Sequence, residues 1–309
     1  MRMLTATAAL LLLSPIPARA ATNAADFLTF GVGARATGMG GAYSAVADDA
    51  TAMYWNPAAL TRINRRSAVV MHAAYLNSSY FDYAAYGQNL GPWGALGAGF
   101  QYFSAGSIPQ TDATGADVGS FTPFDLAASL GYAYRLPDFE FMPDFSGLTL
   151  GMSLKYVQSK IVDTAHTAAA DFGVLFPARF DGRLKTALTA SNIGGKLTYE
   201  QTPEVLPQTV RFGSSFLITP RWVVSADMAV PLKENYYAAA GTEYWLPTAG
   251  PWRLACRAGF NSQTLGSVDG FTGAALGFGL GFTGTTFDYA FVPYGGLGQA
   301  HRVSVTYAF

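Results

Sequence analysis

The chain has 309 residues and a formal net charge of −1, and half of its residues are hydrophobic while only 13% are charged. A soluble globular protein has about a quarter of its residues charged, so this composition favours a membrane protein or a very large apolar core. It excludes the basic surface that nucleic-acid binding requires. After the first twenty residues no apolar run approaches the ~18 residues of a membrane-spanning helix. Lipid otherwise admits only closed barrels, so strands remain as the means of crossing.

The N-terminus has the features of an export signal. Arg2 supplies a positive charge, residues 4–13 form a short apolar stretch, and Ala18 and Ala20 frame a small-x-small cleavage site. These features predict a secretory signal peptide over residues 1–20, with cleavage after Ala20. The alternative, a membrane anchor, is disfavoured because the apolar stretch is too short.

Residues 21–65 show no alternation and are rich in glycine and alanine, with a turn-forming Asn56-Pro57 step. Small residues allow close backbone packing, and proline forces a turn. The segment is too apolar for a disordered tail and too short for a domain. We therefore expect it to fold as a plug inside a barrel formed by residues 66–309.

Residues 66–309 repeat one pattern, in which ten to thirteen residues of alternating character are followed by a turn. Successive side chains of a strand point to opposite faces, so the pattern gives one apolar and one polar wall. About fourteen strands are predicted, an even number as bacterial barrels require. Their expected ranges are 66–76, 79–90, 93–104, 123–135, 147–160, 166–176, 184–193, 207–219, 221–232, 236–246, 251–263, 271–282, 284–292 and 299–309.

The two walls favour a transmembrane β-barrel over a soluble β-sandwich. The apolar wall carries aromatic residues near segment ends, as membrane interfaces require: Tyr75, Tyr134, Trp222, Tyr244, Trp252 and Tyr307. The polar wall carries ionisable residues that we expect to face the lumen: Asp125, Lys155, Asp171, Lys185, Arg211, Asp227, Glu243, Arg257 and Asp288. The predicted fold class is thus all-β, an antiparallel transmembrane barrel with an N-terminal plug.

The connections alternate in length. The long ones, such as 105–122, 194–206 and 264–270, follow odd-numbered strands, and we expect them outside the cell. With about 289 residues left after cleavage, the chain should hold little beyond strands and turns. Glycines at 94–99 and 273–281 could open a lateral gap in the wall, although curved, closely packed strands explain them equally and are favoured.

The residues that usually carry chemistry form no catalytic constellation. Cys256 shares the parity of apolar neighbours and is expected on the lipid side, whereas His72 is expected in the lumen and His166 and His301 at the interfaces. The glycine-rich runs lack the strand, helix and lysine of a phosphate-binding loop. Asp48 and Asp49 have no further ligands at metal-binding spacing, and contact with a lumen cation such as Arg211 or Arg257 is favoured. We expect no enzyme activity, metal or cofactor.

The plug segment resembles the N-terminal signature of the PorV/PorQ family, which is related to the FadL-type outer-membrane transporters. The resemblance rests on Phe-Gly-Val-Gly-Ala-Arg-Ala-Thr-Gly-Met-Gly-Gly-Ala-Tyr, Ala-Asp-Asp-Ala-Thr and Tyr-Trp-Asn-Pro-Ala. Its positions are Gly31, Gly33, Arg35, Gly38, Met39, Gly40, Gly41, Asp48, Asp49, Asn56 and Pro57. The terminal Phe309 resembles the recognition signal for outer-membrane barrel assembly. The resemblance implies fourteen strands and an N-terminal plug.

Two functions follow from this resemblance. A PorV-type protein shuttles or anchors proteins exported by type IX secretion, so its partners would be exported cargo or secretion components. A FadL-type transporter passes apolar small molecules, such as long-chain fatty acids, through the barrel. The short loops predicted here give transport no evident extracellular pocket, but they also reduce the surface available to cargo. In both cases the protein resides in outer-membrane lipid.

Overall fold

The computed structural model describes residues 23–75, 78–138, 146–199, 202–265 and 268–309. The expected signal peptide lies outside the described residues. No helix of the described part of the chain is both long and apolar enough to span a bilayer.

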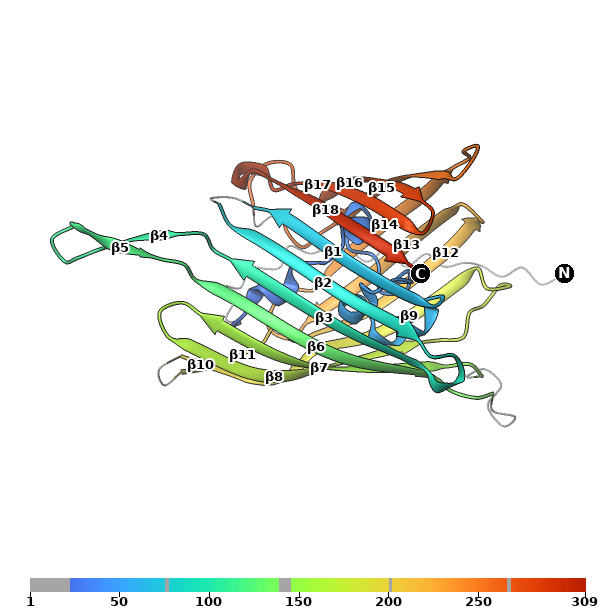
Figure 1. Ribbon diagram of the computed structural model, residues 1–309, viewed down its shortest axis with the longest axis horizontal. Helices are drawn as coiled ribbons and strands as arrows, with labels where there is room; N and C mark the ends of the chain where they lie inside the picture. The colour runs from blue at the N-terminus through green and yellow to red at the C-terminus, as the bar shows by residue number, and fades with distance from the viewer. Residues whose placement is uncertain (1–22, 76–77, 139–145, 200–201, 266–267) are drawn as a thin grey trace.

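Fourteen antiparallel strands close into a barrel when the last strand pairs with the first (Figure 1). This confirms the predicted fold class and strand number. The strands of the wall are β1 (Arg66–Ala74), β2 (Tyr80–Asn89), β3 (Ala95–Ser104), β6 (Phe124–Arg135), β7 (Thr149–Lys160), β8 (Thr164–Leu175), β9 (Leu184–Gly194), β12 (Thr209–Thr219), β13 (Trp222–Pro231), β14 (Tyr237–Leu246), β15 (Trp252–Asn261), β16 (Ala274–Phe282), β17 (Thr285–Pro293) and β18 (Gln299–Ala308).

Two hairpins stand outside the wall, in segments where the sequence predicted loops alone. They consist of β4 (Ile108–Thr111) with β5 (Asp117–Phe121), and of β10 (Lys196–Tyr199) with β11 (Thr202–Val205). In the first, the Asp112 carboxylate accepts hydrogen bonds from the backbone N–H groups of Thr114 and Ala116 and so stabilises the turn. Figure 1 shows this hairpin projecting well beyond the barrel.

Both hairpins mark the extracellular end. They lie between β3 and β6 and between β9 and β12, at the end opposite to the start of β1 and the end of β18. At the other end β12 and β13 are joined by two residues, 220–221, and β16 and β17 by residues 283–284. Outer-membrane barrels have short periplasmic turns and longer extracellular connections. Both ends of the barrel sequence are therefore periplasmic.

The outer wall is apolar and the inner wall is packed against the plug. On β7, Leu154 is 60% exposed, whereas the adjacent Lys155 is 6% exposed. Cys256 lies on the outer face, as expected. Two predicted directions are wrong: His72 faces outward and contacts Asp82, and Tyr75 lines an inner cavity. The inner side of β1 is itself apolar because it packs on the plug, so polarity could not identify its two faces.

The plug crosses the lumen from the extracellular to the periplasmic end. It contains η1 (Asp26–Thr29), α1 (Ala34–Gly38), α2 (Ala52–Trp55) and η2 (Pro57–Arg62). Two further short 3-10 turns, η3 (Gly91–Trp93) and η5 (Gly295–Leu297), lie in connections of the barrel. At the extracellular end the Ala24 N–H donates to the carbonyl of Val205, the last residue of β11 (3.0 Å). At the periplasmic end the Asn89 side chain donates to the Ile63 carbonyl (2.9 Å).

Inward glycines of the wall make room for the plug backbone. A Cβ on Gly151 would lie 2.2 Å from the Ala58 nitrogen, and one on Gly259 would lie 2.1 Å from the Gly40 nitrogen. In the glycine-rich stretch 94–99, a Cβ on Gly97 would lie 2.5 Å from the Met53 sulfur. These glycines therefore let the plug approach the wall closely, a role that the sequence did not reveal.

This packing predicts the effect of one added side chain. Gly151→Val should destabilise the folded barrel by about 1–3 kcal/mol, because the plug backbone at Ala58 must move away. The midpoint of urea unfolding, followed by tryptophan fluorescence, measures the effect. Gly296→Val is the matched control, since the nearest atom to a Cβ there is 3.6 Å away. Equal midpoints for the two variants would contradict the described packing.

Candidate functional site

Helix α1 of the plug is fixed to the barrel wall through Arg35. The Arg35 guanidinium donates two hydrogen bonds to the Glu243 carboxylate of β14, through Nε and Nη2, both at 2.8 Å. Its Nη1 donates to Asp48 Oδ1 at 2.6 Å. A two-pronged contact of this kind fixes direction as well as distance. Arg35 thus orients the first half of the plug against β14.

The pair belongs to a longer row of alternating charges. Glu243 also accepts from Arg257 of β15 (2.7 Å), and Arg257 Nη1 lies 2.8 Å from the Asp288 carboxylate of β17. Glu243, Arg257 and Asp288 are each about 3% exposed or less. Buried charges are tolerated only when they are paired, so each member of the row requires its neighbour.

Asp48 and Asp49 both face Arg35 rather than the predicted Arg211 or Arg257. The Asp49 carboxylate lies 3.9 Å from Arg35 Nη1 and accepts the Thr51 N–H at 2.8 Å, which caps the turn before α2. Burial and the adjacent Asp48 charge raise the pKa of Asp49, against the opposing effect of Arg35. The prediction of a lumen cation was correct in kind but named the wrong arginines.

A second contact ties the plug to β13. Asp227 accepts hydrogen bonds from the backbone N–H groups of Tyr43 and Ser44, at 3.3 and 3.1 Å. Arg211 of β12 lies 3.8 Å from the same carboxylate and donates to the Gly41 carbonyl and to the Tyr237 hydroxyl. The Asp227 carboxylate of the wall therefore accepts the hydrogen bonds of two plug N–H groups that would otherwise be paired within a helix.

The remaining predicted lumen charges also face inward but do not bind the plug. Lys155 pairs with Asp171 at 3.1 Å and donates to the Asn192 side chain at 2.7 Å, beside a bulge between β8 and β9. Asp125 is half-buried near Ser159, and Lys185 is partly buried at the periplasmic end of the barrel. The polar contacts of Lys155 and Asp171 are therefore made within the wall.

The signature residues of the plug have structural roles. The Asn56 carboxamide accepts the Ala58 N–H at 3.1 Å and so caps η2, whose first residue is Pro57. Gly40 has φ +66°, and a Cβ there would lie 2.6 Å from the Phe260 nitrogen of β15. Only glycine combines this backbone with so close an approach. Met39 is fully buried, and Gly38 lies against the backbone of Gly277.

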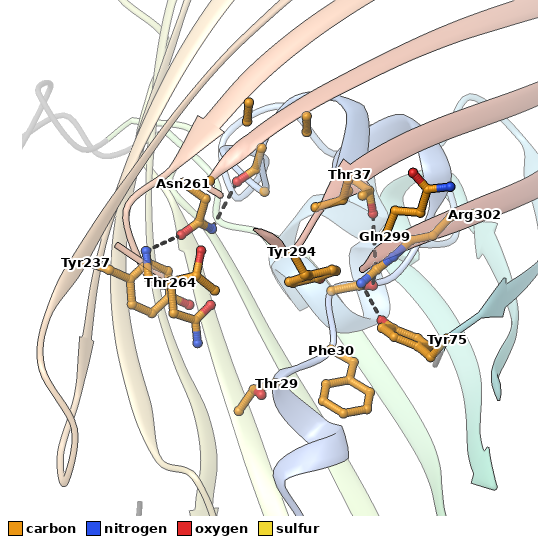
Figure 2. Close-up of a pocket in the computed structure, with 18 of the residues that line it drawn as sticks. Thr29, Phe30, Thr37, Tyr75, Tyr237, Asn261, Thr264, Tyr294, Gln299 and Arg302 are labelled. Carbon is orange, nitrogen blue, oxygen red and sulfur yellow. Dashed lines mark hydrogen bonds between the residues drawn. The ribbon is translucent and has the colours of Figure 1, made fainter. Parts of the chain in front are cut away.

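A cavity of about 420 Å³ lies above the plug at the extracellular end. Its walls are mainly apolar and aromatic, and Figure 2 shows Tyr75, Tyr237 and Tyr294 around it with Phe30 of the plug below. Arg211 and Arg302 are its two cationic lining residues. Apolar clefts with a few convergent polar groups are typical ligand sites. The short predicted loops indicated no such pocket, and neither Arg302 nor Tyr75 was predicted to line one.

Arg302 joins this cavity to the plug. The guanidinium of this β18 residue donates to the Gly31 carbonyl, to the Thr37 hydroxyl at 3.1 Å and to the Tyr75 hydroxyl (Figure 2). Its position opposite the apolar Val303 and Val305 was the available signal in the sequence. All three acceptors are neutral, unlike those of Arg35 and Arg257.

The plug separates this cavity from a second one of about 780 Å³ at the periplasmic end. The second cavity is lined by Thr61 and Arg62 of η2 and by three periplasmic connections. Arg62 donates to the Ala45 carbonyl at 2.6 Å, and burial lowers its pKa to about 10. Among the described residues no cluster of His, Cys, Asp or Glu could hold a metal ion.

Comparison with known proteins identifies the family. The model of the family described as type IX secretion system protein PorV matches residues 16–229, which include the whole plug and more than half of the strands. The chain belongs to the PorV family. It is a bacterial outer-membrane β-barrel, as predicted. A search of curated proteins gave no match.

Solved structures of several other proteins share the fold. The Ralstonia pickettii toluene transporter TbuX is 13% identical (TM-score 0.58), with 89% of this chain and 97% of that chain covered. The P. putida toluene transporter TodX is 14% identical (TM-score 0.60; 90% and 99% covered). A Pseudomonas aeruginosa FadL homologue is 12% identical (TM-score 0.56; 87% and 96% covered). The shared features at this identity are the barrel architecture and its closure.

The buried charge row predicts a large effect at Glu243. Glu243→Gln should destabilise the barrel by about 3–5 kcal/mol, because Arg35 and Arg257 both lose their shared buried counter-charge. The measurement is the temperature at which the folded band converts to the unfolded band on SDS gels. Asp112→Asn on the exposed β4–β5 hairpin is the control and should leave that temperature unchanged. A similar temperature for both variants would show that the row contributes little.

Proposed function

We propose that this PorV-family barrel is a non-enzymatic component of type IX secretion that receives exported proteins at its extracellular end and shuttles or anchors them. The observation that carries the proposal is the family match over residues 16–229. The fixed plug supports it, because an ion pair from β14 and hydrogen bonds from β12, β13 and β18 hold the plug in the lumen. A barrel filled in this way offers its surface rather than its lumen.

The β4–β5 hairpin is the surface that we assign to an exported partner. Its residues project beyond the barrel and are exposed except at its base, and they include the apolar Ile108 (39% exposed) and Val118 (56% exposed). The paired strands leave backbone groups free along their outer edges, and an additional strand can pair with such edges. Exported β-rich domains would find a template there.

A FadL-type transporter of hydrophobic solutes is the second candidate. The apolar cavity of about 420 Å³ at the extracellular end favours it, together with the shared barrel architecture. Transport would require the plug to move, and therefore the contacts of Arg35, Asp227 and Arg302 to break.

Removal of the hairpin should separate these two functions. Deleting residues 108–121 and joining the flanks with a short glycine linker should lower surface-attached exported protein severalfold, because the partner loses its docking strands. Mass spectrometry of the cell surface and medium measures this in a chromosomal replacement. Uptake of a radiolabelled long-chain fatty acid is measured in the same cells.

The full deletion and the double substitution Ile108→Ser/Val118→Ser provide matched comparisons, since the latter keeps the hairpin but removes its apolar side chains. Normal secretion with lost fatty-acid uptake in the full deletion would reject the secretion function and support transport. Normal secretion in the hairpin deletion alone would reject the hairpin as the docking surface.

A further inference from the structure

The cavity at the periplasmic end has positive charge without a matching negative charge. Its charged lining residues are Arg62 of η2 and Arg135 at the end of β6, and no Asp or Glu of the described residues lines it. Arg62 donates to the Ala45 carbonyl at 2.6 Å, and no ion pair among the described residues includes Arg62 or Arg135. The nearby Asp48 is already bound to Arg35 at 2.6 Å. Two guanidinium groups are therefore available to an anion in this cavity.

The barrel is basic around this cavity and acidic at its other end. Lys185 of β9 faces inward and lies near Arg62. Further arginines occur in the periplasmic connections and at the strand ends beside them: Arg65, Arg66, Arg183, Arg221 and Arg253. The described extracellular connections instead carry many carboxylates, among them Asp112, Asp117, Asp163, Glu234 and Asp269. The field of the protein therefore draws an acidic molecule to the periplasmic end.

The cavity faces the aqueous periplasm and not the lipid. It lies between η2, which is inside the barrel, the β2–β3 turn and the residues that precede β7 and follow β8. Arg135 has the same inward parity as the fully buried Ala133. An anionic lipid headgroup would have to leave the bilayer to reach Arg62 and Arg135. A soluble periplasmic molecule reaches them directly.

The β8–β9 turn beside the cavity displays an aromatic side chain on a strained backbone. Phe180 and Asp181 have φ of +54° and +56°, a region that is unfavourable for residues with a Cβ. Phe180 is 70% exposed and lies two residues beyond Ala178, which lines the cavity. Backbone strain of this kind is concentrated at functional sites. The turn therefore presents an apolar contact next to the two arginines.

We propose that the periplasmic mouth, defined as this cavity together with Phe180, binds an acidic, extended peptide segment of a periplasmic protein. Carboxylates of the segment pair with Arg62 and Arg135, and one of its apolar side chains packs on Phe180. A guanidinium binds a carboxylate through two parallel hydrogen bonds, so the pairing also fixes the direction of the segment. The cavity volume of about 780 Å³ accommodates several residues of an extended chain. The site lies across the plug from the β4–β5 hairpin and does not depend on the role of that hairpin.

The test compares an acidic peptide with its neutral counterpart. The full mature barrel in phosphatidylcholine nanodiscs is titrated with the peptide Asp-Phe-Glu-Leu-Asp-Phe-Glu, and with the same peptide carrying Asn and Gln in place of Asp and Glu. Isothermal titration calorimetry, with empty nanodiscs subtracted, measures binding. The acidic peptide should bind about 10- to 100-fold more tightly, as expected for hydrogen bonds between charged groups sheltered from water. Equal affinities, or tighter binding of the neutral peptide, overturn the proposal without any variant.

Two arginine variants assign the preference to the cavity. Arg135→Gln should reduce the preference for the acidic peptide, and Arg62→Gln/Arg135→Gln should abolish it. Arg253→Gln is the matched control, since Arg253 lies at the same end but stacks on Trp245 outside the cavity lining. Full preference in the double variant, or its loss in Arg253→Gln, contradicts the assignment. Heat-modifiable migration on SDS gels verifies assembly, and Arg135→Gln alone decides if the double variant does not assemble.

A substitution at Phe180 separates binding from stability. Asparagine is tolerated in the left-handed region better than phenylalanine, so Phe180→Asn should leave the unfolding temperature on SDS gels unchanged or higher. Loss of the ring should weaken binding of the acidic peptide about 10-fold, the lower limit for burial of a phenylalanine side chain. Phe271→Asn is the matched control, because Phe271 is 71% exposed on an extracellular connection. Unchanged affinity in Phe180→Asn, or an equal loss in Phe271→Asn, contradicts the aromatic contact.

Two further measurements test the alternative occupants of the cavity. Succinate is titrated as a small dicarboxylate, and binding as tight as that of the acidic peptide would overturn the proposal in favour of a small anion. The connection 139–145 of this chain carries Glu140 and Asp144. Peptide binding that occurs only in Glu140→Gln/Asp144→Asn would overturn the proposal in favour of this connection. Weaker binding of succinate, and peptide binding by the unsubstituted barrel, support the acidic segment.

Discussion

The ion pair and the hydrogen bonds between the plug and the inner wall are the interactions on which the rest of the structure depends. A closed barrel of fourteen strands encloses a space that must be either wet or filled. Here it is filled by a segment that lacks long helices and so leaves many backbone groups without internal partners. Wall side chains supply these partners: Glu243 holds Arg35, Asp227 holds the turn at Tyr43 and Ser44, and Arg302 holds Gly31.

This constraint explains the two kinds of residue on the inner wall. Glu243 and Asp227 lie where the plug offers an arginine or an unpaired backbone group, and glycines occur where its backbone touches the wall, as at Gly151 and Gly259. The outer wall has the simpler requirement of contact with lipid, which aliphatic and aromatic side chains meet. Both walls follow the same two-residue period, but only the outer one has a uniform chemistry.

The plug also divides the lumen into two parts. Below it lies the larger periplasmic cavity beside Arg62, and above it the apolar cavity with its two arginines. Two solved structures of the same fold are described as toluene transporters. In this PorV-family chain the exposed β4–β5 hairpin projects from the extracellular end.

The sequence by itself determined the barrel, because alternation along each strand is a local property and closure follows from the number of strands and the demands of lipid. It also marked the plug, whose glycines and Asn56-Pro57 step act on their own backbone. Tertiary structure alone decided which charges meet, since Arg35 and Glu243 are 208 residues apart and several lumen arginines were equivalent candidates for Asp48. It also decided the faces of β1, where a plug-lined interior is as apolar as the exterior, and so placed His72 outside and Tyr75 in the cavity. It also decided the partners of Arg302, because Thr37 and Tyr75 are more than 200 residues away from it along the chain.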